Sequence, residues 1–370
     1  MSGSIAVAGI ASDDRHRSRE TSPDTSGPRV LGCADYIAAD GSLRVRTENV
    51  ATYADPAPGG LYTHPVWLRT YGVQDLLIVE GVNSERAVPR LVFARERGGL
   101  VHQGRLFRLD AALIDALGER LLKRPGVHFV VFEDVDVAGP IATGFGRFVF
   151  HYQNNWRLPL AEASERMSKQ LVGNTKRKAR ALARENPGLS VRFEASPNQS
   201  VLETIAAFGR IRIEGQGRRY GIDETEVARL SAVAAEIGHA TIVRKDDTVL
   251  AADLICIAGT QAHFLTHGYD PGYPKSSLGM ISLVNSIETC AAQGLTDFNL
   301  MWGDLPYKQQ LGAERVPLQT IVMRRSPLAI PHPGYLAAVA HFGWADVKRR
   351  LKPTVAALRA WRAKKRAAPE

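Results

Sequence analysis

The second half of this chain is an ordered series of helix-like and strand-like segments, and this order restricts the fold more than any other feature. Two helical segments precede three strands, a long helical segment, a strand, a short helix and a final strand. They are residues 200–215, 223–238, 240–246, 249–258, 262–270, 273–295, 296–304, 306–314 and 316–324. Asp223 is suited to begin the second helix and Gly238 to end it. The order α-α-β-β-β-α-β-α-β predicts an α/β fold.

The first half shows a similar but weaker β-β-β-α-β pattern. Its clearest helix covers residues 110–124, where Leu113, Leu117 and Leu121 recur at four-residue spacing behind Asp110. The chain therefore divides into a leader, two halves and a basic tail. The predicted parts are residues 1–30, 31–155, 156–325 and 326–370.

Composition narrows the class of protein. The chain has 370 residues, of which 45% are hydrophobic, which is enough for two cores. Its three cysteines lack CxxC spacing, which argues against a disulfide framework or a zinc site, and we expect no metal. The sequence shows neither a secretory signal nor an apolar run of membrane-spanning length, so we expect a cytoplasmic protein.

Positive charge is concentrated in two segments. The net charge is +9, and residues 341–370 contain nine Lys or Arg against two acids. Residues 169–184 contain six Lys or Arg and no acid. Either segment can be a solvated helix face, or it can contact an anionic partner such as a membrane surface, a lipid-linked sugar or tRNA.

The tail combines these cations with apolar side chains. Trp344 and several aliphatic residues in 335–366 suit a membrane interface, at the inner face of the membrane for a cytoplasmic protein. A nucleic-acid arm and a packed helix with a frayed end are the alternatives. Pro353 interrupts the segment and favours two helices over one.

The stretch "YPKSSLGMISLVNSIETCAAQGL", residues 273–295, begins with a polar loop and continues as an apolar helix. One interpretation is ordinary capping, with Ser276 or Ser277 accepting from the first backbone N–H groups. The other is an anion site, since a helix start carries unpaired donors and partial positive charge.

Three stretches resemble a known family. They are "SKQLVGNTKRKARALAREN", "YDPGYPKSSLGMISLVNSIETCAAQGL" and "FNLMWGDLPYKQQLGAE". They are similar to segments of the CelD/BcsL-type acetyltransferase-like proteins, which have the GNAT acyltransferase fold and are relatives of the FemABX aminoacyl transferases. The resemblance covers roughly residues 156–323. It implies an α/β (α+β) GNAT fold, with two tandem GNAT-like halves and a mixed central sheet.

The resemblance also implies a cofactor site. Acyl-CoA, most simply acetyl-CoA, would place its pyrophosphate at the start of the long helix. The residues implied in cofactor binding are Lys275, Ser276, Ser277, Leu278, Gly279, Met280 and Lys308. Tyr307 would protonate the leaving thiolate, and Tyr269, Trp302 and Asp304 would contact the substrate.

Candidate bases come from the residue types themselves. His267 and Tyr269 point to one face of a strand, and strict alternation places His263 on that face too. Histidine has the pKa suited to accept a proton from the acceptor, although a structural role is the more frequent one for a histidine. Glu214 precedes a Gly-rich turn, and Asp253 interrupts an apolar strand, where a buried acid would need a partner.

Three functions follow. The first is acyl transfer from acyl-CoA, by direct attack, to an amine or hydroxyl of a cell-envelope or polysaccharide precursor. The second is FemABX-like transfer from aminoacyl-tRNA. The third is a catalytically silent GNAT-like module that binds a membrane surface, which the single glycine of the phosphate loop, Gly279, favours.

Overall fold

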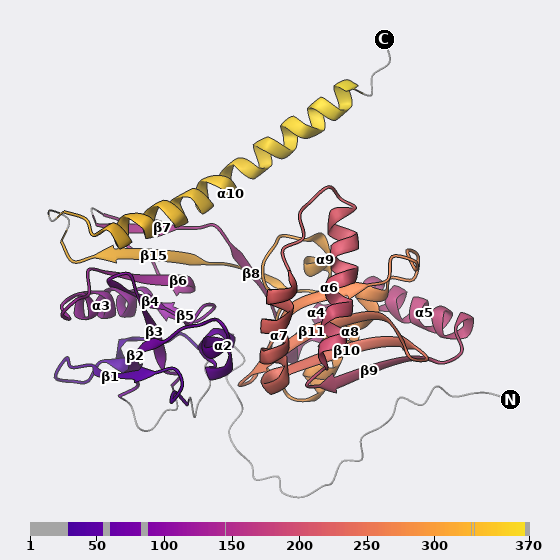
Figure 1. Cartoon of the computed structure of the whole chain (residues 1–370), viewed down its shortest axis with the longest axis horizontal. Helices are drawn as coiled ribbons and strands as arrows, with labels where there is room; N and C mark the ends of the chain where they lie inside the picture. Colours follow the sequence, from indigo (N-terminus) through magenta and orange to yellow (C-terminus); the bar gives the residue numbers. More distant parts are fainter. Residues whose placement is uncertain are drawn as a thin grey trace, which may run out of the picture.

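The computed structural model describes residues 29–54, 60–82, 88–144, 146–326, 328 and 330–366. Nearly all of the predicted leader lies outside these residues. Within them the chain forms two sheets that lie side by side, each covered by helices (Figure 1). Both sheets contain parallel and antiparallel pairs, as expected for a mixed α/β fold.

The N-terminal sheet has the order β1-β2-β3-β4-β6-β15-β7, and β5 pairs with β6 beyond β4. Its strands are β1 (Arg44–Asn49), β2 (Asp75–Glu80), β3 (Leu91–Glu96), β4 (Gly99–His102), β5 (Arg108–Asp110), β6 (Phe129–Ala138), β7 (Arg147–Phe150) and β15 (Gln319–Arg324). The C-terminal sheet has the order β14-β8-β13-β12-β11-β10-β9. Its strands are β8 (Asn154–Pro159), β9 (Leu189–Ala195), β10 (Gly238–Lys245), β11 (Thr248–Ala258), β12 (Gln261–Tyr269), β13 (Asp297–Asn299) and β14 (Glu314–Pro317).

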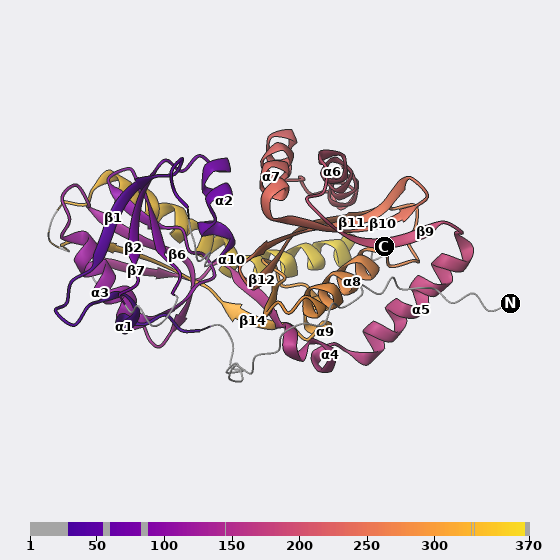
Figure 2. The same ribbon diagram turned by 90° about the horizontal axis from the view of Figure 1, so that it is seen from below.

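Helices cover both faces of each sheet. They are α1 (Cys33–Tyr36), α2 (Pro65–Thr70), α3 (Ala111–Leu122), α4 (Ala163–Arg166), α5 (Lys169–Glu185), α6 (Gln199–Glu214), α7 (Glu224–Ile237), α8 (Leu278–Ala292), α9 (Pro306–Gln310) and α10 (Pro333–Arg366), with 3-10 turns η1 (Leu61–Thr63) and η2 (Leu160–Glu162). Figure 2 shows α6 and α7 on one side of the C-terminal sheet and α4, α5, α8 and α9 on the other. In the N-terminal half, α3 packs in the core on one face, while Tyr335 and Phe342 of α10 pack on the other.

The two sheets repeat one pattern. In each, four strands run antiparallel in sequence order, a fifth lies parallel to the fourth, and the sixth and seventh are antiparallel again. A helix joins the fourth strand to the fifth in both, α3 before β6 and α8 before β13. The chain is therefore built from two tandem halves of the same architecture, as the sequence predicts.

The halves exchange a strand, which corrects the predicted boundaries. Strand β15 follows β14, but it pairs with β6 and β7 in the N-terminal sheet. Strand β8 follows β7 directly and pairs with β13 and β14 in the C-terminal sheet. The prediction that residues 316–324 end the C-terminal half was therefore wrong for β15, and the C-terminal sheet begins at Asn154 rather than at residue 156.

A second contact between the halves involves aromatic and apolar side chains. Tyr62 stacks on Trp302, with ring centroids 6.5 Å apart, inside a cluster that also contains buried residues of α7 and β11. Arg69 of α2 forms an ion pair with Glu236 of α7 at 2.9 Å. Trp302, predicted to contact substrate, therefore lies at the junction of the halves.

The tail forms one helix. Alpha helix α10 continues through Pro353, so the expected division into two helices does not occur. Its first half lies on β7 and β15, and its second half extends beyond the body of the molecule (Figure 1).

Candidate functional site

In the C-terminal sheet, the neighbouring strands β12 and β13 pair over only part of the length of β12. Strand β12 pairs with β13 only at Gln261–His263, and the following six residues of β12 continue without this neighbour. The chain after Asn299 turns away, with Met301 at φ 56°. The two strands therefore diverge beyond His263, on the side toward which α8 begins.

Lys308 stabilises the segment that leaves the sheet after β13. Its side chain is buried, and Nζ donates to the carbonyl oxygens of Leu300, Met301 and Trp302 at 2.8, 3.0 and 2.6 Å. These carbonyls belong to the segment that would otherwise extend β13. The ammonium thus replaces a neighbouring strand, and it has no donor left for a phosphate. The sequence analysis assigned Lys308 to cofactor binding, but its contacts in the structure are with the backbone of the protein itself.

The start of α8 lies at the end of the split strand. Ser277 occupies the N-cap position with φ 55°, but its side chain caps no helix N–H group. Its hydroxyl instead accepts a hydrogen bond from Lys178 Nζ of α5 at 2.6 Å. No described residue accepts from the backbone N–H of Leu278 or Gly279. Open donors and an ammonium group therefore meet at one helix start, which favours the anion interpretation over capping.

Gly279 serves packing as well as access. A Cβ at this position would lie 2.9 Å from Cδ1 of Tyr269 and 3.4 Å from Nδ1 of His267. The helix therefore contacts both rings of β12 through its backbone. A larger residue here would displace the ring of Tyr269, whether or not a ligand is bound.

His267 is held by Arg212 of α6. Arg212 Nη1 lies 3.0 Å from Nε2 of His267, and the guanidinium stacks over the ring of Tyr269 at 5.3 Å. Since arginine can only donate, Nε2 accepts, and the ring carries its proton on Nδ1. Burial, together with the charges of Arg212 and Lys308, lowers the pKa of His267 to about 4. A ring in this state is a weak base at neutral pH.

A bulge separates the two histidines of β12. Asp253 of β11 pairs with His267, but Cys256 pairs with His263 because the register shifts by one residue at Leu265. Asp253 and Cys256 are three residues apart, so they face opposite sides of the sheet. The prediction that His263 shares a face with His267 was therefore wrong.

Asp253 is a buried acid with hydroxyl partners. Ser282 and Ser286 of α8 donate to its two oxygens at 3.0 and 3.3 Å. Burial outweighs these bonds and raises the pKa of Asp253 to about 8. The sequence left open whether this side chain faces inward, and the structure places it under α8, next to the candidate site.

Asp253 should make stability depend on pH. Between about pH 4 and pH 8 the folded protein keeps a proton that the unfolded chain releases, so the free energy of unfolding falls as pH rises. Asp253→Asn removes this dependence. We expect the stability of this variant, relative to the parent, to increase between pH 5 and pH 8 in urea denaturation. Asp246→Asn in an exposed turn is the control, and a difference that is constant with pH would contradict the assignment.

Tyr307 lies beside this cluster on α9. Burial and the charge of Asp253 raise its pKa to about 12, and Arg212 acts in the opposite direction. The ring packs against the core under α8, and within the described part of the chain its hydroxyl makes no hydrogen bond. The phenol is therefore protonated at neutral pH and available as a donor.

The remaining residues predicted for the site are exposed, flank the helix start or bond to other parts of the protein. Glu214 is exposed at the end of α6, and Lys275 is exposed in the loop before α8. Asp304 is exposed and accepts from Trp156 and Arg315 at 3.0 and 3.2 Å. Ser276 and Met280, both half-buried, flank the helix start. The sequence analysis did not select Arg212 or Lys178, although Lys178 belongs to the basic segment 169–184.

The N-terminal half lacks the same features. In the C-terminal sheet, β12 has no neighbour on one side beyond its pairing with β13. At the equivalent place in the N-terminal sheet, the additional strand β5 pairs with β6 at Asp136–Ala138. The corresponding helix, α3, is capped by Asp110, whose carboxylate accepts from the N–H of Ala112. A carboxylate at this position repels an anion. The features that suit a ligand therefore occur in the C-terminal half.

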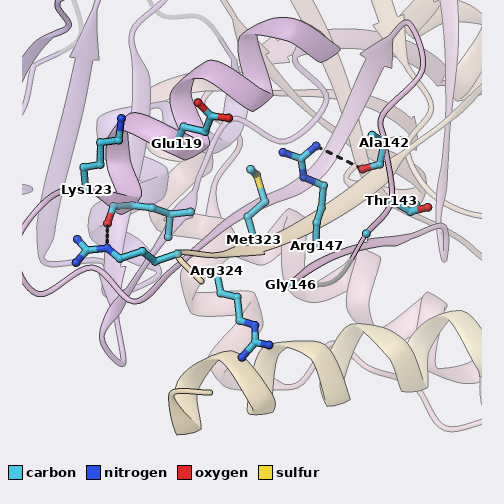
Figure 3. Close-up of a pocket in the computed structure, with 11 residues that line it drawn as sticks. Glu119, Lys123, Ala142, Thr143, Gly146, Arg147, Met323 and Arg324 are labelled. Atoms are coloured by element: carbon cyan, nitrogen blue, oxygen red, sulfur yellow. Dashed lines mark hydrogen bonds between the residues drawn. The ribbon is translucent and has the colours of Figure 1, made fainter. Parts of the chain in front are cut away.

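Figure 3 shows a separate cavity of about 450 Å³ in the N-terminal half, beside α3 and the strands β7 and β15. Arg147 forms an ion pair with Asp115 at 2.8 Å, and Arg325 donates to the carbonyl of Leu122 at 2.6 Å. Arg324 points toward α10, away from the cavity (Figure 3). The three arginine side chains are therefore occupied by contacts with other groups of the protein.

Two further findings concern sites of other kinds. No helix among the described residues has the length and hydropathy needed to cross a bilayer. In the same part of the chain, no group of three or more His, Cys, Asp or Glu is placed to hold a metal ion.

Comparison with known proteins agrees with this architecture. Residues 169–309 match the family model described as an acetyltransferase (GNAT) domain. No curated protein sequence matches the chain. Among solved structures, FemX is 12% identical with a TM-score of 0.50, over 74% of this chain and 94% of that chain. L-PGS from Bacillus licheniformis is 12% identical with a TM-score of 0.42, over 69% and 86%. A tandem GNAT protein from the clavulanic acid biosynthesis pathway is 13% identical with a TM-score of 0.38, over 78% and 100%.

The match to the GNAT-domain model, with the repeated sheets, confirms the predicted fold class. The chain has a mixed α/β GNAT fold in two tandem halves. The matched residues include α5, the split strand, α8 and Tyr307, so the GNAT match and the candidate site coincide. At the level of reaction class, they support an acyltransferase.

Proposed function

We propose that the C-terminal half transfers an acyl group from acyl-CoA to an amine or hydroxyl acceptor. The observation that carries the proposal is the open start of α8, with Lys178 over Ser277, at the split between β12 and β13. This arrangement suits a pyrophosphate beside the part of β12 that has no pairing with β13.

The residues at this site fit such a ligand. The N–H groups of Leu278 and Gly279 and the ammonium of Lys178 would hold the pyrophosphate. Bound acyl-CoA supplies an activated thioester. Tyr307 would donate its proton to the sulfur as it leaves, since burial keeps the phenol protonated. Arg212 and His267 would fix the ring of Tyr269 at the edge of the split.

The protonation state of the cysteines supports direct attack of the acceptor on the acyl group. Cys256 and Cys290 are buried, and burial raises the pKa of each to about 12. The pKa of the half-buried Cys33 is raised as well, and this residue lies in the N-terminal half. A thiol that stays protonated is a poor nucleophile. The acyl group would therefore pass to the acceptor without a cysteine-bound intermediate.

The acceptor is proposed from the sequence resemblance. The similarity to CelD/BcsL-type proteins supports an amine or hydroxyl of a cell-envelope or polysaccharide precursor, and acetyl is the simplest acyl group. An acyl-CoA donor also implies a cytoplasmic location.

Transfer from aminoacyl-tRNA is the second candidate. It is favoured by α5, where the exposed cations Arg177 and Arg180 lie close to Lys178 in the sequence. Several cations on one helix suit a polynucleotide better than a single pyrophosphate.

Lys178→Ala tests the donor. Removing a charged hydrogen bond to the pyrophosphate should weaken acetyl-CoA binding on the order of 10- to 100-fold in titration calorimetry. Lys176→Ala is the matched control, because Lys176 lies on the same helix but forms an ion pair with Glu288. Equal affinities of parent and Lys178→Ala would contradict the site. Binding of aminoacyl-tRNA, without binding of acetyl-CoA, would select the second candidate.

A further inference from the structure

Helix α10 exposes an apolar stripe. Four large side chains on it are well exposed: Leu336 at 52%, Trp344 at 59%, Val347 at 42% and Leu351 at 51%. At about 100° per residue they fall within an arc of roughly 80° on the helix. Tyr335 and Phe342 lie on a different face and are buried against the N-terminal sheet. The stripe is therefore separate from the face that packs the helix on the body.

A basic groove lies next to the stripe. It has a volume of about 650 Å³ and separates α10 from the beginning of β8, the Gly303–Asp304 turn and β14. Five cations line it: Arg315, Lys348, Arg349, Arg350 and Lys352.

The charge of this groove is only partly balanced. Its one acid, Asp304, pairs with Arg315, and Arg350 pairs with Asp346. Lys348 and Lys352 have no acidic partner among the described residues, and the Lys348 ammonium lies over the ring of Trp344 at 5.2 Å. The same helix thus presents exposed apolar side chains and unbalanced positive charge.

We propose that α10 docks the protein on an anionic lipid bilayer. The stripe would enter the interfacial region, and the ammonium groups of Lys348 and Lys352 would bind lipid phosphate groups. Charge complementarity selects this occupant. A neutral protein groove would leave the lysines unpaired, and a nucleic acid would leave the aliphatic stripe in water. The docking does not depend on the proposed chemistry.

The experiment is co-sedimentation of the full chain with vesicles. We expect pelleting with vesicles of phosphatidylcholine plus one-third phosphatidylglycerol, little pelleting with phosphatidylcholine alone, and weaker pelleting as salt rises. Trp344→Ser with Leu351→Ser, and separately Lys348→Ser with Lys352→Ser, should each lower the partition coefficient on the order of 10-fold or more.

Matched controls separate docking from general effects. Ile211→Ser with Leu305→Ser removes two side chains of similar exposure, 54% and 49%, outside α10. Arg177→Ser with Arg180→Ser removes two exposed charges from α5. Both control variants should pellet like the parent, and all variants should keep the parent's thermal midpoint.

Three results would overturn the proposal. They are absence of pelleting by the parent, equal loss in the α10 and control variants, and equal pelleting with neutral vesicles. Binding of the parent to an RNA homopolymer, unaffected by Trp344→Ser with Leu351→Ser and without vesicle pelleting, would assign α10 to nucleic acid instead.

Discussion

Tyr307→Phe should lower the turnover number about 10²- to 10⁴-fold, the range typical of removing a positioned proton donor. The phenylalanine keeps the ring that packs under α8 and removes only the hydroxyl. Acyl-CoA affinity should therefore stay close to that of the parent, because the pyrophosphate contacts lie on α8 and α5. The measurement is release of the CoA thiol in the presence of an amine or hydroxyl acceptor, together with calorimetric titration of acyl-CoA.

Tyr273→Phe is the matched control for this effect. Tyr273 lies in the loop before α8 and packs near its start, but it belongs to a different core cluster from Tyr307. Its hydroxyl has no place in the proposed chemistry. An unchanged turnover number for Tyr307→Phe, or an equal loss in Tyr273→Phe, would remove Tyr307 from the reaction.

Lys308→Met should destabilise the C-terminal half by about 3 kcal/mol or more. The substitution leaves the carbonyls of Leu300, Met301 and Trp302 without their shared donor, and each unsatisfied buried group costs on the order of 1 kcal/mol or more. The midpoint of urea denaturation, followed by tryptophan fluorescence, measures this loss.

Gln309→Met introduces the same side chain at the next, exposed position of α9 and should leave the midpoint unchanged. If Lys308→Met is as stable as the parent but binds acyl-CoA less tightly, then Lys308 contacts the ligand as the sequence analysis predicted. If both properties are unchanged, the three carbonyls find other donors.

Local chemistry in the sequence predicted local structure well. Asp110 and Asp223 cap their helices as expected, because a cap depends on residues within one turn. The long helix after β12, and the order of helices and strands along the C-terminal half of the chain, also follow from periodicity and turn residues. Strand β8 was not predicted, since it carries few apolar residues and its pairing comes from distant segments. Strand β9 was also missed, although its apolar and polar residues alternate.

Features that depend on distant contacts could not be predicted in this way. The bulge at Leu265 has no local signature, yet it decides which histidine faces α8. Arg212 reaches His267 from 55 residues away, and Lys308 looks like a surface lysine until its three carbonyl partners are known. The resemblance predicted an anion site at the start of α8, and this stays a prediction. It also implied a ligand contact for Lys308, whose ammonium instead donates to three backbone carbonyls.

The strand exchange has a consequence for the order in which the protein is made. When a ribosome has synthesised the chain through Phe150, seven of the eight strands of the N-terminal sheet exist, but the strand that joins β6 to β7 does not. That strand, β15, is complete only at Arg324. The apolar edge of β6 therefore waits, unpaired, while the whole C-terminal half is translated, and such an edge is prone to associate with other chains. We expect the nascent N-terminal half to be a chaperone client until the last strand arrives.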